Sequence, residues 1–263
     1  MTGDQLLGVC VAGATGWAGA AIARGVAAAP DLALRSAVSR SAARTTLDGG
    51  VPVHASVRDA LEGVAVLVDY TAVDVVKDNT LAAIAAGVGV VIGTSGLTAA
   101  DFADIDAAAR GTGVGVVAAG NFSLTAAMCS AAALLAARHL PQWEVIDYAS
   151  ATKPDVPSGT ARELAERLGD VRPPELGHPI EDLHGPQEAR GATVGGAQVH
   201  SVRLPSFVVS TEVVFGLPDE RLTIRHDAGG SPAPYVAGTL AAVRGVTGLV
   251  GLVRGLDTLL LRG

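Results

Sequence analysis

The sequence predicts an α/β protein with two domains, in which a parallel sheet comes first and an α+β domain with a mixed or antiparallel sheet follows. Three observations support this fold class. Short apolar runs alternate with helical patterns as far as residue 119, whereas strand-like runs follow one another beyond residue 190. Hydrophobic residues make up 49% of the chain but aromatic residues only 3%, so Ala, Val and Leu must build the core. Such a core suits helices packed closely on a parallel sheet.

Apolar runs define the strands of the first domain. The segments 17–29, 73–86 and 99–110 have helical patterns. Strands that alternate with helices predict βα units, and hence a parallel sheet. The predicted strands are 6–12, 32–38, 64–70, 87–93 and 114–119.

The pattern changes after Phe122. The segment 170–190 is rich in Pro, Gly and charge and is predicted to be a loop. The predicted helices are 123–139, 161–168 and 233–246. Gly169 is expected to end the second of them. The predicted strands are 143–151, 192–204, 207–216 and 220–227, and a short apolar tail closes the chain. Several strands in succession predict a mixed or antiparallel sheet rather than further βα units.

Composition and charge exclude several classes of function. The formal net charge is -7 and no dense basic cluster is present, so nucleic acid and membranes are not expected as partners. Cys10 and Cys129 lie in apolar runs, which favours buried thiols, and no Cys/His spacing predicts a metal site. Asp4 interrupts the N-terminus before any apolar segment of a signal peptide, and the apolar runs are too short to span a bilayer. We therefore expect a soluble, cytoplasmic protein without a metal.

A glycine-rich loop directly follows the first strand and opens the first helix. Glycines at this place let the backbone turn tightly and approach a pyrophosphate, which binds at the helix N-terminus. The alternative is a tight strand–helix turn without a ligand. Because the loop is the first of several βα turns, it predicts a Rossmann-type dinucleotide-binding domain over 1–122. The predicted contacts are Gly13, Thr15, Gly16, Trp17, Ala18 and Gly19.

The end of the second strand predicts which dinucleotide is bound. An NAD site usually has Asp or Glu there, to hold the ribose 2′-hydroxyl. This strand ends in Ala37-Val38-Ser39-Arg40-Ser41, without an acid. The guanidinium of Arg40 can pair with a 2′-phosphate, and Ser39 and Ser41 add hydroxyl donors. NADPH is therefore predicted as the preferred cofactor over NADH; the alternative is that Arg40 is a solvated loop charge.

A second motif, Lys153-Pro154-Asp155-Val156-Pro157-Ser158-Gly159-Thr160, precedes the helix 161–168. Thr160 and Glu163 have the spacing of a capping box. The N–H groups of Ser158, Gly159 and Thr160 are expected to converge on one anion, such as a substrate carboxylate. Lys153 would add a positive charge or a proton. The alternative is an ordinary capped helix with Lys153 in solvent.

The glycine loop and the Lys153–Thr160 motif resemble those of the dihydrodipicolinate reductase family and occur in the same order along the chain. The resemblance runs nearly end to end. It implies an NAD(P)H-dependent enzyme that forms a homotetramer through the sheet of a substrate-binding domain, residues 123–233. It also implies a C-terminal helix that returns to the cofactor domain, which then comprises 1–122 and 234–263. Further cofactor contacts implied by matching motifs are Tyr70, Thr71, Gly93, Thr94, Ser95, Gly120, Asn121 and Phe122. The implied substrate contacts are Ser95, Ser150, Lys153, Ser158, Gly159 and Thr160, and Lys153 is the predicted catalytic residue.

Two motifs depart from the family: a His-His-x-His run, and a later Gly-Glu-His or Ala-His-Gln element, which here has Ser210 in place of its His. Where the family has a His-His-x-His run, whose first His is taken to be the proton donor, this chain has Ala149, Ser150, Ala151 and Thr152. Losing a general acid costs about 10²–10⁴-fold in rate. We therefore predict an oxidoreductase with a changed substrate, a small cyclic imine or enamine carboxylate, with secondary metabolism as one setting. A protonated imine needs hydride at carbon only, because its nitrogen already carries the proton.

Three alternatives stay open. The chain could be a genuine 4-hydroxy-tetrahydrodipicolinate reductase of lysine biosynthesis in which Lys153, or secondarily Tyr148, donates the proton. It could be a catalytically silent homologue that binds NADPH. It could also run in the reverse direction as an amine or amino-acid dehydrogenase.

Overall fold

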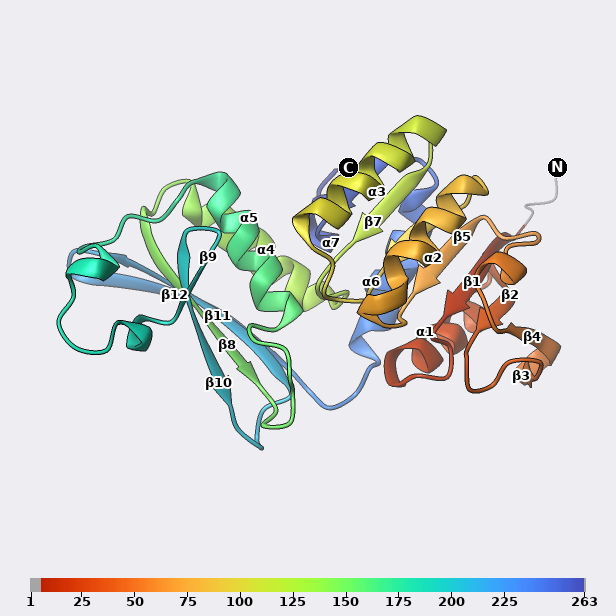
Figure 1. The fold of residues 1–263 in the computed structure, drawn as a ribbon, viewed down its shortest axis with the longest axis horizontal. Helices are drawn as coiled ribbons and strands as arrows, with labels where there is room; N and C mark the ends of the chain where they lie inside the picture. The colour runs from red at the N-terminus through yellow and green to blue at the C-terminus, as the bar shows by residue number, and fades with distance from the viewer. Residues whose placement is uncertain (1–5, 263) are drawn as a thin grey trace. The chain divides into compact units, whose positions relative to one another are not determined.

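The computed structural model describes residues 6–262, which form two compact units (Figure 1). Unit 1 comprises Met1–Leu124 and Pro232–Gly263, and unit 2 comprises Thr125–Ser231. Unit 1 contains a mostly parallel sheet and unit 2 a mixed sheet. The predicted α/β fold class, with a Rossmann-type domain and a second α+β domain, is confirmed.

Unit 1 is built on an eight-stranded sheet with the order β13-β7-β6-β5-β1-β2-β4-β3. Every pair in it is parallel except β3 with β4. The chain adds β2 on one side of β1 and β5 on the other, so the strand order reverses at β1, where ligands of such sheets bind. The strands are β1 (Leu7–Ala12), β2 (Leu32–Val38), β3 (Thr46–Leu47), β4 (Val51–His54), β5 (Val66–Asp69), β6 (Gly89–Ile92), β7 (Gly115–Ala118) and β13 (Gly251–Arg254).

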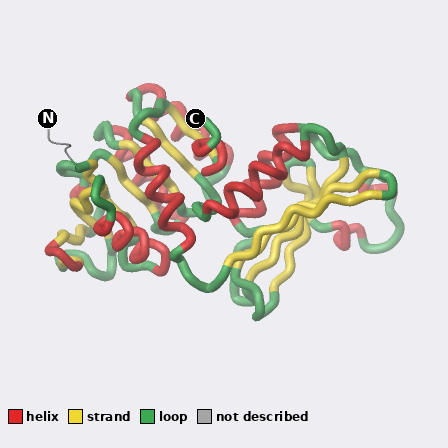
Figure 2. The backbone as a smooth tube through the Cα atoms, turned by 180° about the vertical axis from the view of Figure 1, so that it is seen from behind, coloured by secondary structure: helices red, strands yellow, loops and turns green. Residues whose placement is uncertain are grey.

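Helices cover both faces of this sheet (Figures 1 and 2). Cys10 and Ala12 of β1 belong to one core cluster with residues of α2 and α3. Since side chains alternate along a strand, Val9 and Val11 face the opposite layer. There α1 packs beside α6. The helices are α1 (Trp17–Ala28), α2 (Val73–Ala85), α3 (Ala99–Thr112), α6 (Pro234–Val246) and α7 (Leu256–Leu260).

Unit 2 contains a five-stranded sheet with the order β12-β11-β8-β10-β9. β8 and β10 are parallel and the other pairs are antiparallel. Along β8, Trp143, Val145, Asp147 and Ala149 are buried, whereas the residues between them are only partly covered. The elements are α4 (Leu124–Ala137), β8 (Gln142–Ala149), α5 (Gly159–Val171), β9 (Ala192–Val194), β10 (Ala197–Arg203), β11 (Val209–Leu217) and β12 (Glu220–Ala228).

Four elements differ from the sequence prediction. β3 and β4 were not predicted, because strands this short acquire their identity from pairing with a neighbour. The predicted apolar tail contains β13, which pairs in parallel with β7 at the sheet edge. The expectation that Gly169 ends α5 was wrong. A Cβ at Gly169 would lie 2.0 Å from the carbonyl oxygen of Gly195, so the glycine allows close packing of the helix on the β9–β10 turn.

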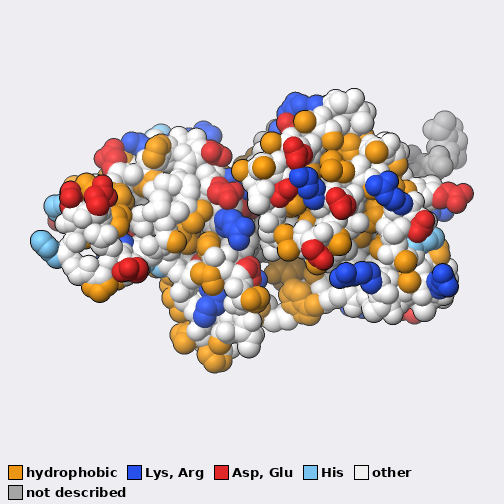
Figure 3. Space-filling model, in the orientation of Figure 1, with side chains coloured by type: hydrophobic (Ala, Val, Ile, Leu, Met, Phe, Trp, Pro, Cys, Tyr) orange, Lys and Arg blue, Asp and Glu red, His pale blue; other side chains and the backbone are white. Residues whose placement is uncertain are grey.

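No helix within residues 6–262 is long and apolar enough to cross a membrane. On the face of the molecule drawn in Figure 3, Lys and Arg side chains are interspersed with Asp and Glu.

The start of α1 depends on a missing side chain, which gives a first prediction. A Cβ at Gly19 would lie 2.0 Å from the carbonyl oxygen of Gly13, and backbone cannot move as a flexible side chain does. Gly19→Val should therefore lower the midpoint of thermal unfolding, by the equivalent of about 1–3 kcal/mol or more. Gly111→Ala in α3 is the matched control, because a Cβ there meets nothing within 4 Å. Equal midpoints for the two variants would show that this contact is unimportant.

Candidate functional site

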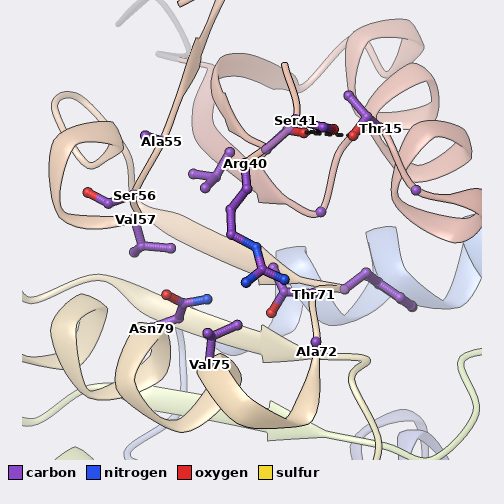
Figure 4. Close-up of a pocket in the computed structure, with 15 residues that line it drawn as sticks. Thr15, Arg40, Ser41, Ala55, Ser56, Val57, Thr71, Ala72, Val75 and Asn79 are labelled. Carbon is purple, nitrogen blue, oxygen red and sulfur yellow. Dashed lines mark hydrogen bonds between the residues drawn. The ribbon is translucent and has the colours of Figure 1, made fainter. Parts of the chain in front are cut away.

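Unit 1 has a cavity of about 540 Å³ at the carboxyl ends of its strands (Figure 4). The segments that follow β1, β2, β4 and β5 all contribute to it. Its lining residues are Gly13, Thr15, Gly16, Val38, Ser39, Arg40, Ser41, Ala55, Ser56, Val57, Tyr70, Thr71, Ala72, Val75 and Asn79. The cavity lies where the strand order reverses, which is the place for a dinucleotide in such a sheet.

The glycine loop forms one wall of this cavity. Gly13 has a φ of 79°, and a Cβ on it would lie 2.3 Å from the carbonyl oxygen of Tyr70. The N–H of Gly16 donates to the carbonyl oxygen of Gly13 at 2.9 Å, which closes the turn. α1 then begins at Trp17, and no side chain caps it. Backbone N–H groups at such a helix start suit a phosphate.

A chain of hydroxyls lies beside the loop. Thr15 Oγ1 and Ser39 Oγ are 2.7 Å apart, and Ser39 Oγ and Ser41 Oγ are 3.2 Å apart. Arg40 extends from the end of β2 into the cavity, toward Thr71 (Figure 4). Among the described lining residues, Arg40 is the one charged side chain. The cavity therefore offers a guanidinium and hydroxyls to an anionic ligand, and no lining carboxylate competes for them.

A buried carboxylate orders the far wall. Asp69 is fully buried at the end of β5. Its Oδ1 accepts hydrogen bonds from Thr71 N–H at 2.9 Å, Thr71 Oγ1 at 2.6 Å and Thr94 Oγ1 at 3.0 Å. Its Oδ2 accepts from Asn79 Nδ2 at 2.8 Å. The segments after β5 and β6 and the first turns of α2 are thus tied to one side chain.

Tyr70 lies between this wall and α6. Its hydroxyl is 2.9 Å from Thr239 Oγ1, and its ring is tilted against that of Phe122, with centroids 6.2 Å apart. A Cβ at Gly93 would lie 2.3 Å from the Tyr70 ring, so this glycine lets the chain pass over the aromatic face. Burial raises the pKa of Tyr70, although its hydrogen bond with Thr239 opposes the shift. The phenol of Tyr70 therefore serves packing and hydrogen bonding, and it is a poor acid near neutral pH.

The cavity brings together only part of the predicted cofactor set. Trp17 is 56% exposed, with its ring 5.8 Å from that of Tyr235, and Phe122 is buried. Ser95 is exposed, and Asn121 Oδ1 accepts a hydrogen bond from Ser123 N–H. The predicted residues outside the lining are Trp17, Ala18, Gly19, Gly93, Thr94, Ser95, Gly120, Asn121 and Phe122.

Sequence reasoning missed another part of the lining. Ala55, Ser56 and Val57 follow β4, a strand that the sequence did not predict. Val75 and Asn79 lie one turn apart on α2. This helical spacing was the available signal, since residues four apart share a helix face.

In unit 2, the predicted lysine loop follows β8. Lys153 N–H donates to the carbonyl oxygen of Ser150 at 3.0 Å, and Ser150 Oγ lies 3.1 Å from Thr152 Oγ1. Lys153 Nζ forms an ion pair with Asp155 Oδ1 at 2.9 Å. The two side chains are 29% and 31% exposed, so the ammonium is paired within the loop and remains partly open to solvent.

The predicted anion site at the start of α5 needs correction. Ser158, not Thr160, is the N-cap, and its Oγ accepts from Ala161 N–H at 3.4 Å. Ser158 N–H does not join a set of three converging donors, because it donates to the buried Asp147 Oδ2 at 2.9 Å. Gly159 and Thr160 form the first turn of the helix, whose N-terminal end still favours negative charge.

Tyr148 has a structural environment. Its hydroxyl donates to Glu212 Oε2 at 3.2 Å, and the guanidinium of Arg225 lies 4.7 Å from its ring centroid. Partial burial, followed by the Glu212 carboxylate, raises the pKa of Tyr148. Since side chains alternate along β8, Tyr148 points away from the face of Ala149. It is therefore a poor substitute for the missing histidine.

Within residues 6–262, no group of three or more His, Cys, Asp or Glu side chains is arranged to hold a metal ion.

Comparison with known proteins covers almost the whole chain. The family model of the dihydrodipicolinate reductase N-terminus matches residues 7–122, and that of the C-terminus matches residues 121–260. The 4-hydroxy-tetrahydrodipicolinate reductase of Trichormus variabilis is 34% identical over 99% of this chain and 100% of its own length. That of Desulfitobacterium hafniense is 41% identical over 74% of this chain and 73% of its own length.

Solved structures with the same fold include a dihydrodipicolinate reductase. The dipicolinate-bound dihydrodipicolinate reductase from Paenisporosarcina sp. TG-14 superposes with a TM-score of 0.77 at 27% identity, over 96% of this chain and 99% of that one. An amine dehydrogenase from Mycobacterium smegmatis shares the fold alone, with a TM-score of 0.63 at 14% identity, over 97% of this chain and 93% of that one. The matched family models and the relatives spanning nearly the full length confirm the predicted kinship, and the chain belongs to the dihydrodipicolinate reductase family.

Proposed function

We propose that the chain is a nicotinamide-dependent reductase that prefers NADPH and acts on the C=N or conjugated C=C bond of a small cyclic imine or enamine carboxylate. One observation carries this proposal. The loop of unit 2 keeps an oriented Lys153 and a capped helix start, while Ala149 and Ser150 stand where the family has histidines. The substrate is proposed to differ from that of the lysine pathway, with secondary metabolism as one setting.

The cavity of unit 1 supports the cofactor assignment. Gly13 and Gly16 allow the backbone to approach a pyrophosphate, and Arg40 would pair with a 2′-phosphate. No described lining residue is a carboxylate that could accept a hydrogen bond from a ribose 2′-hydroxyl. When bound there, the reduced nicotinamide supplies hydride.

The loop of unit 2 supports a carboxylate substrate. The Lys153 ammonium is already held by Asp155, at 2.9 Å, so little side-chain freedom is lost when an anion joins it. The start of α5 adds a positive dipole end beside the loop. Lys153 would hold the carboxylate, or donate a proton where the substrate needs one.

The missing histidines favour an imine. Reduction of a conjugated carbon pair needs a proton on the neighbouring carbon, and loss of a general acid costs about 10²–10⁴-fold. A protonated imine brings its own proton on nitrogen. Ser150 is far too weak an acid near neutral pH, and the pKa of Tyr148 is raised. The residues present thus suit a substrate that needs no carbon protonation.

The names of the relatives favour a second candidate. Relatives 34–41% identical are called 4-hydroxy-tetrahydrodipicolinate reductase, and the solved structure at 27% identity holds dipicolinate. In that case Lys153 would replace the histidine as proton donor. A silent NADPH-binding homologue is less favoured, because it would not need the Lys153 loop. The homotetramer and the cytoplasmic location stay predictions.

The two candidates differ in one assay. NADPH oxidation should be slow with freshly generated 4-hydroxy-tetrahydrodipicolinate and fast with a cyclic imine carboxylate such as 1-piperideine-2-carboxylate. The expected gap is at least about a hundredfold in kcat/KM, because the first substrate needs the missing acid. Brisk oxidation with the first substrate would establish the second candidate. Tight NADPH binding without oxidation of it by either substrate would support the silent homologue.

Arg40 should decide the choice of cofactor. Arg40→Met should weaken NADPH binding about 10- to 100-fold and leave NADH binding unchanged, because a charge-assisted contact to the 2′-phosphate is lost. Titration calorimetry with each cofactor measures this. Arg24→Met, an exposed position on α1 outside the cavity lining, is the control. An equal loss for both cofactors would contradict the assigned role.

Lys153 should act on the substrate alone. Lys153→Met should reduce turnover at least about a hundredfold, through loss of the charge that holds the carboxylate or supplies the proton, while NADPH affinity is kept. Lys77→Met is the matched control, since Lys77 also forms ion pairs but lies on α2. Steady-state rates and cofactor titration measure the two quantities. A near-normal rate for Lys153→Met would remove this residue from the mechanism.

A further inference from the structure

A buried ion pair lies beneath the lysine loop of unit 2. Asp147 on β8 is 0% exposed, and Arg203 at the end of β10 reaches it with Nη2 to Oδ2 at 2.8 Å. The same Nη2 donates to the backbone carbonyl of Asp155 at 2.7 Å. Arg203 Nη1 donates to the carbonyl oxygen of Val202 at 3.0 Å, which orients the guanidinium plane. One guanidinium therefore joins the sheet to the loop.

Asp147 holds the loop at a second point. Its Oδ2 accepts from Ser158 N–H at 2.9 Å and from Ser201 Oγ at 3.0 Å, in addition to Arg203. The chain is thus tied at the carbonyl of Asp155 and again at the N–H of Ser158. Between these ties Val156 is 62% exposed, so apolar packing does little to hold this stretch. Hydrogen bonds to the ion pair must set its conformation.

The same ties reach Lys153. The carboxylate of Asp155 is the ion-pair partner of Lys153, and Arg203 binds the carbonyl of that same residue. Ser158 donates its N–H to Asp147 and is also the N-cap of α5. The ion pair therefore fixes both the residue that orients the ammonium and the start of the helix.

The pair is poorly arranged for stability alone. Asp147 Oδ1 and Arg203 Nε are both buried without a hydrogen-bond partner in the described structure. Buried polar atoms left unpaired are costly, and a buried ion pair often stabilises a fold no better than apolar residues of similar size. What the pair does provide is an attachment at two points, because Arg203 Nη2 donates both to Asp147 Oδ2 and to the carbonyl of Asp155 while the carbonyl of Val202 holds Nη1.

We propose that Asp147 and Arg203 are positioning residues that hold the Lys153–Thr160 loop in its substrate-binding conformation. The inference rests on the proposed function for its substrate, since the loop is taken as the carboxylate site. Asp147 and Arg203 would then influence substrate affinity through the conformation of the loop, without contacting the substrate.

The first test needs no substrate. In full-length Arg203→Met, amide hydrogen exchange of the 153–160 peptide, followed by mass spectrometry, should be at least about tenfold faster, while peptides of β8 and β11 keep their protection. Arg203→Lys should lie between wild type and Arg203→Met, because one ammonium can still donate to the two oxygens that Nη2 binds but lacks the second nitrogen that the Val202 carbonyl holds. Arg172→Met is the matched control; it removes an ion pair with Glu175 near the end of α5 and should leave the loop unchanged.

The second test separates positioning from general damage. With the substrate identified by the assay above, Arg203→Met and Asp147→Asn should raise KM at least about tenfold with a smaller change in kcat, and NADPH affinity should stay at the wild-type value. The KM of Arg203→Lys should lie between those of wild type and Arg203→Met.

The outcomes are distinct for the two proposals. Unchanged exchange of the 153–160 peptide in folded Arg203→Met or Arg203→Lys would overturn the positioning role. Loss of protection across all of unit 2, in Arg203→Lys as well, would also overturn it, since the pair would then serve stability. If wild type reduces none of the substrates, the proposed function fails, while the exchange experiment still decides the positioning role.

Discussion

The fit of α1 against the end of β1 is the contact on which unit 1 depends. The backbone of Gly19 comes so close to the carbonyl of Gly13 that a single added carbon would overlap it. This contact places the uncapped start of α1 at the carboxyl edge of the sheet, next to the reversal in strand order. Backbone donors and the segments after four strands then share one cavity.

Each unit has a buried carboxylate, Asp69 or Asp147, that ties together the segments around it. Asp69 collects donors from Thr71, Thr94 and Asn79 in unit 1. Asp147 collects Ser158, Ser201 and Arg203 in unit 2. A buried carboxylate accepts several hydrogen bonds at once, and it is costly to leave unpaired, so it enforces one loop conformation. Side chains that face a ligand can then vary without loss of loop geometry.

The place of the family's histidine run lies beside one of these loops. Ala149, Ser150, Ala151 and Thr152 stand where the family has its histidine run. Ala149 pairs with Arg203 of β10 and Val209 of β11, and the other three residues follow the end of β8. The lysine loop that follows is still tied from below. An enzyme with this arrangement keeps its means of binding an anion and loses a proton donor, which is the basis for proposing an imine.

The sequence by itself determined the fold class, the strand Leu32–Val38, the place of the glycine loop and the family. These features depend on local periodicity and on motifs whose spacing is visible along the chain. Only the tertiary structure decided that Ala55–Val57 line the cavity, that β13 completes the sheet, and that Ser158 N–H turns inward to Asp147. Each of these rests on a pairing between segments far apart in the sequence. Short strands and single hydrogen bonds leave no local pattern, because the partner that stabilises them comes from elsewhere in the chain.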